Sequence, residues 1–70
     1  MWCPRCEQGE IVKAMINQNK SMIYVCEECE ATWFNQADIN EKSFLDFGTY
    51  MMSINLQPLW SELTVPFIDE

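Results

Sequence analysis

The sequence predicts an α+β fold, in which a small metal-bound antiparallel sheet of three strands is followed by a C-terminal helical segment. Two observations support this prediction. Four of the 70 residues are cysteines, arranged as two C-x-x-C pairs, Cys3/Cys6 and Cys26/Cys29. Short runs of β-branched and apolar residues fill the first half of the chain, whereas apolar residues recur at helical spacing from residue 43 onward.

The two C-x-x-C pairs predict a closed tetrahedral metal site. Nineteen residues, 7–25, separate the pairs, and a segment of this length can return the second pair to the first, so that four thiolates surround one ion. The chain has no histidine and no fifth cysteine, so no ligand position stays open for water or substrate. We therefore expect a structural site for one Zn²⁺ ion, because zinc suits the closed four-thiolate tetrahedron.

Three other uses of the cysteines are open. Iron binds in the same geometry, four cysteines can form disulfides in three pairings, and a C-x-x-C motif can be redox-active. The repeated spacing favours metal binding over disulfides and redox chemistry. Neither a signal peptide nor an apolar stretch of about 20 residues is visible. We therefore expect a cytoplasmic protein without a membrane role, in a compartment where cysteines stay reduced.

A chain of 70 residues is short for a fold that is stabilised by burial alone. Ordering the chain costs about 1.5 kcal/mol per residue and nearly cancels the free energy gained from apolar burial. A structural zinc ion contributes about 10–16 kcal/mol of apparent binding free energy. We therefore expect the metal to decide whether the domain folds.

Three strands are expected around the cysteine pairs. They are predicted at residues 10–16, 22–25 and 31–34, with a polar turn at 17–20 whose asparagines tolerate left-handed backbone. Two strands joined by a turn between two C-x-x-C pairs are the plan of a zinc ribbon, and residues 2–34 resemble that family. The resemblance implies the fold and the ion but no particular role, because zinc ribbons serve many functions.

The turns at the cysteine pairs depart from the commonest pattern of rubredoxin-like knuckles. Such knuckles often have glycine directly after the second cysteine, where the backbone turns with positive φ. Glu7 and Glu30 occupy these positions here, and Gly9 lies two residues after Glu7. We expect a wider turn at each pair rather than glutamates with positive φ. The missing glycines also weaken the case for iron.

The second half of the chain predicts helical structure. Ser43 and Asp46 have the spacing of a helix N-cap, and apolar residues follow at three- and four-residue spacing, so we expect a helix over residues 43–54. Pro58 is suited to open a short second helix over residues 59–63. One domain of residues 1–70 is thus divided into a zinc ribbon (1–34), a loop (35–42), a helical segment (43–64) and a tail (65–70).

The chain is strongly acidic, with four Lys or Arg against eleven Asp or Glu and a formal net charge of −7. No basic residue follows Lys42. Nucleic-acid binding draws most of its affinity from basic side chains that displace counterions, so we expect no direct contact with nucleic acid. The charge instead favours a basic protein partner, attracted by the long-range field.

Nothing in the sequence indicates catalysis. Histidine, the side chain that titrates near neutral pH, is absent. The serines have no evident activating base, and a metal saturated with sulfur cannot activate water. We therefore expect a non-enzymatic protein.

Aromatic and acidic residues are the candidate partner surface. Tryptophan and other large apolar residues ringed by charge are typical of interface hot spots. The candidates are Trp60, Phe67, Glu27, Glu28, Glu30 and Glu62. The alternative for the aromatic residues is that the segment from Leu59 onward folds back over the sheet and joins the core.

Small acidic proteins of this kind resemble the immunity proteins that bacteria encode beside secreted toxins. The resemblance implies an inhibitor that covers the active site of a basic nuclease or another basic toxin by charge complementarity. The alternative is a transcription- or translation-associated zinc ribbon that assists a nucleic-acid machine. An electron carrier with iron in place of zinc is a third option.

Overall fold

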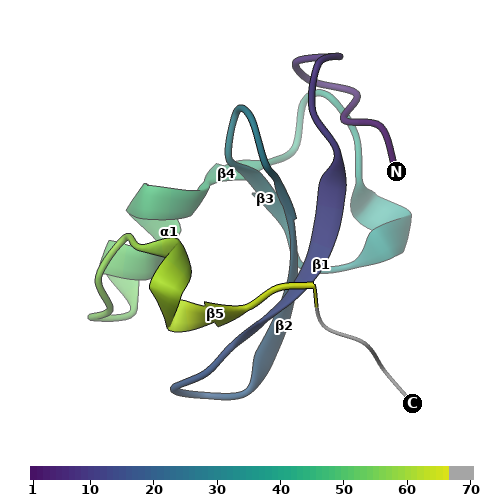
Figure 1. The fold of residues 1–70 in the computed structure, drawn as a ribbon. Coiled ribbons are helices and arrows are strands. Elements are labelled where there is room, and N and C mark those ends of the chain that lie inside the picture. The colour runs from purple at the N-terminus through teal and green to yellow at the C-terminus, as the bar shows by residue number, and fades with distance from the viewer. Residues whose placement is uncertain (67–70) are drawn as a thin grey trace.

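The computed structural model describes residues 1–66 of the chain (Figure 1). Its elements are β1 (Ile11–Ile16), β2 (Ser21–Cys26), β3 (Ala31–Trp33), a 3₁₀ helix (Gln36–Asp38), β4 (Leu45–Asp46), α1 (Phe47–Ser53), a second 3₁₀ helix (Trp60–Glu62) and β5 (Leu63–Thr64). The strand pairs are antiparallel, and the sheet order is β4-β3-β2-β1-β5. An antiparallel sheet combined with one short α-helix is an α+β arrangement.

β1 and β2 form the central hairpin of the sheet, close to the strands that the sequence predicts. The paired positions begin with Ile11 opposite Cys26. In the turn between the strands, the left-handed conformation that we expect of an asparagine is adopted by Lys20, with φ 62°. Asn19 stabilises the turn differently, because its Oδ1 accepts a hydrogen bond from the N–H of Ser21 at 2.9 Å.

The described sheet has five strands, so the prediction of three is wrong. The two added strands are two residues long and lie at the edges of the sheet. β4 pairs with β3, with Asp46 opposite Ala31, and β5 pairs with β1, with Leu63 opposite Ile16. Such short strands form only because distant residues pair with them, and they leave no alternating pattern in the sequence.

The predicted helix over residues 43–54 is wrong at its N-terminus, because α1 begins at Phe47. The segment before Phe47 is extended, since β4 pairs with β3. Asp46, rather than Ser43, is the N-cap, and its carboxylate accepts a hydrogen bond from the N–H of Thr49 at 3.0 Å. Backbone pairing with the sheet therefore overrides the capping pattern that begins at Ser43.

The segment from Leu59 to Pro66 folds back onto the sheet. The predicted second helix is a single 3₁₀ turn, Trp60–Glu62, and β5 follows it directly. In Figure 1 this yellow-green segment runs from the side of α1 to β1. Leu63 is buried and Val65 packs against the core. Among residues 1–66, no helix has the length and apolar character needed to cross a bilayer.

The buried residues form two clusters. The α1 cluster comprises Ala14, Ile16, Ile23, Val25, Phe47, Met51 and Leu63. The cysteine cluster comprises Cys3, Ile11, Cys26, Ala31 and Trp33. Phe44 packs against the cysteine cluster and Phe47 lies inside the α1 cluster. The three-residue spacing of Phe44 and Phe47 predicts that they share one helix face, but the two rings pack in different clusters.

Candidate metal centre

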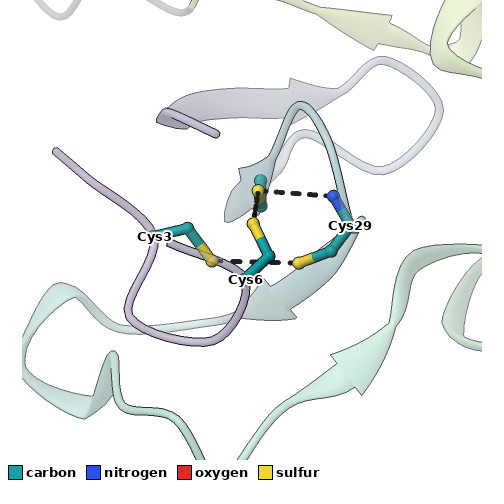
Figure 2. A group of neighbouring side chains, drawn as sticks. Cys3, Cys6 and Cys29 are labelled. Carbon is teal, nitrogen blue, oxygen red and sulfur yellow. Dashed lines mark hydrogen bonds between the residues drawn. The ribbon is translucent and has the colours of Figure 1, made fainter. Parts of the chain in front are cut away.

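The four cysteines meet at one end of the central hairpin. Cys3 and Cys6 precede β1, Cys26 ends β2, and Cys29 lies in the turn that leads to β3. Figure 2 shows the sulfurs of Cys3, Cys6 and Cys29 turned toward one another. All four sulfurs lie within 4.8 Å of one another. The prediction that the two pairs form one cluster is confirmed.

The spacing of the sulfurs fits a single tetrahedral ion. Zinc–sulfur bonds of about 2.3 Å place the sulfurs of a tetrahedron about 3.8 Å apart. Cys3 Sγ lies 3.8 Å from Cys29 Sγ, and Cys6 Sγ lies 3.6 Å from Cys26 Sγ. Both distances are much longer than a disulfide bond of about 2.0 Å, and the four cysteines are free thiols. The cluster can therefore hold one metal ion.

Each cysteine pair folds as the same turn. The N–H of Glu7 donates to the carbonyl of Cys3 at 3.0 Å, and the N–H of Glu30 donates to the carbonyl of Cys26 at 3.1 Å. Both glutamates have positive φ, 55° at Glu7 and 62° at Glu30. The prediction of a wider turn is therefore wrong. The tight turn needs left-handed backbone directly after the second cysteine, whichever residue stands there.

Replacing Glu7 with glycine is expected to raise the free energy of unfolding of the zinc-bound protein by about 0.5–1 kcal/mol, because glycine adopts positive φ without steric cost. The Glu7 side chain is exposed. Replacing Glu30 with glycine relieves the same backbone but removes a carboxylate that binds Trp60, so no gain is expected. Chemical denaturation at saturating zinc compares the two variants, and a less stable Glu7→Gly protein would contradict this account.

Hydrogen bonding and burial distinguish the sulfur of Cys26 from that of Cys6. Cys26 Sγ accepts hydrogen bonds from the N–H of Glu28 at 3.4 Å and the N–H of Cys29 at 3.5 Å. Burial nevertheless raises the pKa of Cys26 to about 12, whereas a hydrogen bond from the backbone of Gln8 lowers the pKa of Cys6 to about 7. A metal ion binds the thiolate form of cysteine, so a protonated Cys26 would release its proton on metal binding.

Arg5 places positive charge beside the sulfurs. A hydrogen bond to the side chain of Cys29 raises the pKa of the Arg5 guanidinium above its ordinary value. The guanidinium carbon lies 4.4 Å from the centroid of the Phe44 ring. Four thiolates that hold a dication would carry a net charge of about −2. The positive charge of Arg5 would partly offset it. Sequence reasoning did not assign a role to Arg5, and its position between two ligands is the signal that points to it.

Gly9 is a second residue of the centre that ligand spacing does not identify. It is buried, and its carbonyl accepts a hydrogen bond from the N–H of Cys3 at 2.9 Å. A β-carbon on Gly9 would lie 2.8 Å from Cys26 Sγ and 2.7 Å from Glu28 Cγ. Its φ is not positive, so glycine is required here by the close approach of the second cysteine turn.

Glu30 connects the metal centre to the C-terminal segment. Its carbonyl accepts a hydrogen bond from the N–H of Phe47 at 2.9 Å, and its carboxylate accepts one from Trp60 Nε1 at 2.8 Å. The ring centroids of Trp60 and Phe47 are 5.7 Å apart. One residue beside a cysteine ligand therefore contacts both α1 and the 3₁₀ turn that follows it.

The predicted partner residues lie in different surroundings. Trp60 is half-buried and packs against the α1 cluster, which is the alternative that the sequence left open for it. Its contact with a partner stays a prediction, and Phe67 lies outside the described residues. Among the four candidate glutamates, Glu27 and Glu28 are exposed. Glu30 and Glu62 are half-buried.

Comparison with protein-family models, with curated proteins and with solved structures finds no match for this chain. The function is therefore inferred from the residues of the chain itself. Their clearest feature is a cluster of four thiols that can bind one metal ion.

Proposed function

We propose that the protein is a zinc-binding, non-enzymatic interaction module whose metal centre stabilises an acidic surface that binds a basic protein. The observation that carries this proposal is the cluster of four cysteine sulfurs within 4.8 Å of one another. Such a cluster completes a tetrahedron from protein ligands alone, so the ion has no open position for substrate. The role of the ion is then to stabilise the fold.

Zinc is the ion that this ligand set favours, because zinc has no redox chemistry and accepts a closed tetrahedron of thiolates. Native mass spectrometry of the purified protein should show one zinc ion per chain, and the solution should be colourless. Strong visible absorption from iron–thiolate bonds would contradict the proposal and indicate an electron carrier.

Charge supports the binding role. The chain has a formal net charge of −7, and Glu27 and Glu28 are exposed on the second cysteine turn. Arg5, one of four basic residues, is directed at the sulfur of Cys29. An acidic surface accelerates association with a basic partner and disfavours contact with phosphate groups.

An immunity protein that neutralises a basic toxin or nuclease is the specific form of this proposal, supported by small size and acidity. The second candidate is a transcription- or translation-associated zinc ribbon. It is supported by the cluster of four cysteines, since a zinc ribbon of that kind would hold its ion with such a cluster. The two candidates differ in what the isolated protein should bind.

Affinity capture separates these candidates. The zinc-loaded protein should retain basic proteins, and high salt should slow their association. The Glu27→Gln/Glu28→Gln variant should associate with basic proteins more slowly than a Glu7→Gln/Glu41→Gln variant. The second variant removes the same amount of charge from outside the second cysteine turn. Binding of DNA or RNA by the wild-type protein at physiological salt would contradict the proposal and support the second candidate.

A further inference from the structure

A pocket of about 530 Å³ lies between the loop after β3 and the sheet edge formed by β3 and β4. Four apolar side chains line it, namely Trp33, Phe34, Phe44 and Leu45, and Asp38 is the charged residue of the lining. This volume falls within the range of about 300–1,000 Å³ that is usual for small-molecule sites, and the pocket is widely open to solvent. None of the cysteines lines it, although Trp33 belongs to the cysteine cluster and Phe44 packs against that cluster.

The aromatic walls of the pocket are held in place by neighbouring rings. The Phe34 ring lies 4.8 Å from the ring of Tyr50, and the Trp33 ring lies 6.4 Å from the ring of Phe44, measured between centroids. Phe34 nevertheless remains 48% exposed and Leu45 remains 45% exposed. The pocket therefore presents fixed apolar surface that the described part of the chain leaves uncovered.

Asp38 gives the pocket a negative charge. Within residues 1–66 its carboxylate makes no ion pair and no hydrogen bond, although its backbone carbonyl accepts one from Asn40 at 2.7 Å. A carboxylate beside aromatic faces attracts a cation, because the faces of the rings carry negative potential. The Arg5 guanidinium already lies over the Phe44 ring at 4.4 Å and Trp33 is only 2% exposed, so Phe34 is the aromatic wall that offers an exposed face to a further cation.

We propose that this pocket binds an arginine side chain of a basic partner protein, with the guanidinium against the exposed Phe34 ring and paired with Asp38. This proposal rests on the proposed function and names the surface that it uses. Arginine fits better than lysine, because its planar guanidinium stacks on aromatic rings and forms two parallel hydrogen bonds to a carboxylate. A phosphate group would be repelled by Asp38, so nucleic acid is not the expected occupant.

A peptide titration tests the proposal on the full-length, zinc-loaded protein. The probe is a blocked pentapeptide, acetyl-Gly-Ser-Arg-Ser-Gly-amide, and its match carries citrulline, which has the shape of arginine without the charge. The arginine peptide should shift the NMR signal of the Trp33 indole N–H in a saturable manner, and the citrulline peptide should not. Equal shifts with both peptides, or no shift with the arginine peptide, would overturn the proposal.

Two variants separate the local contact from the overall charge. Asp38→Asn and Glu41→Gln each remove one negative charge from the same loop, but Glu41 does not line the pocket. Asp38→Asn should weaken binding of the arginine peptide about threefold or more, and Glu41→Gln should change it less than about twofold. Equal losses in the two variants would mean that only net charge matters and would overturn the proposal.

The same variants distinguish failure of the pocket from failure of the proposed function. If wild-type and Asp38→Asn proteins capture basic proteins equally well, the pocket proposal is wrong and the interaction role stands. If the wild-type protein captures no basic protein but the arginine peptide still binds and depends on Asp38, the pocket is supported and the proposed function is wrong.

Discussion

Replacing Cys26 with serine is expected to leave the chain largely unfolded at room temperature. Cys26 is fully buried, and its sulfur lies 3.6 Å from that of Cys6. Loss of one thiolate forfeits much of the roughly 10–16 kcal/mol that a structural zinc ion contributes. That amount is comparable to the whole stability of a typical domain, about 5–15 kcal/mol. Far-UV circular dichroism of the purified variant measures the loss of the sheet.

Tryptophan fluorescence gives a second measure of the same change. Trp60 donates a hydrogen bond to Glu30, beside the ligand Cys29, and packs on Phe47. Unfolding exposes this ring to water, so emission should shift to longer wavelength. Wild-type protein treated with a strong chelator is the matched control, and it should show the same shift and recover when zinc is added. A cooperative melt that neither the substitution nor the chelator changes would show that the ion is not structural.

Replacing Gly9 with alanine is expected to weaken zinc binding about tenfold or more and to lower stability by about 1–3 kcal/mol. The added methyl group would lie 2.8 Å from Cys26 Sγ and 2.7 Å from Glu28 Cγ. The sulfur cannot move away without leaving its position in the tetrahedron, because two backbone N–H groups also bind it. Competition with a chelator of known affinity measures the change in zinc binding.

Gly48→Ala is the matched control for this substitution. Gly48 lies on α1, far in sequence from the four cysteines. A β-carbon on Gly48 would lie 3.3 Å from Asp46 Oδ2 and 3.4 Å from Pro58 Cβ. The helix propensity of alanine offsets this crowding, so stability should change by less than about 1 kcal/mol and zinc binding should not change. If Gly9→Ala binds zinc as tightly as Gly48→Ala does, the close approach at Gly9 is not a constraint on the metal centre.

The metal ligands and the central hairpin could be predicted because their signals are local. The C-x-x-C spacing is sufficient to identify Cys3, Cys6, Cys26 and Cys29 as one cluster. Runs of β-branched residues between two cysteine pairs identify β1 and β2 to within one residue at each end. Neither inference needs knowledge of how distant segments meet.

The remaining features depend on contacts between distant residues. The extended conformation of Asp46 follows from its pairing with Ala31 and not from its neighbours in sequence. Positive φ at Glu7 and Glu30 opposes the ordinary preference of glutamate, and the geometry of the cysteine turn decides it. The role of Gly9 becomes visible only when the second turn is placed against it.

The register of the central hairpin would let a bound ion select the correct strand pairing. Ile11 lies opposite Cys26, so the correctly paired hairpin places the two cysteine turns side by side. Hairpins form in about 1–10 μs, and the unfolded chain therefore samples several registers rapidly. A slip of one residue would turn Cys26 toward the opposite face of the sheet. An ion held by all four cysteines would bind only the correctly aligned hairpin, so metal binding would favour that register over misaligned pairings.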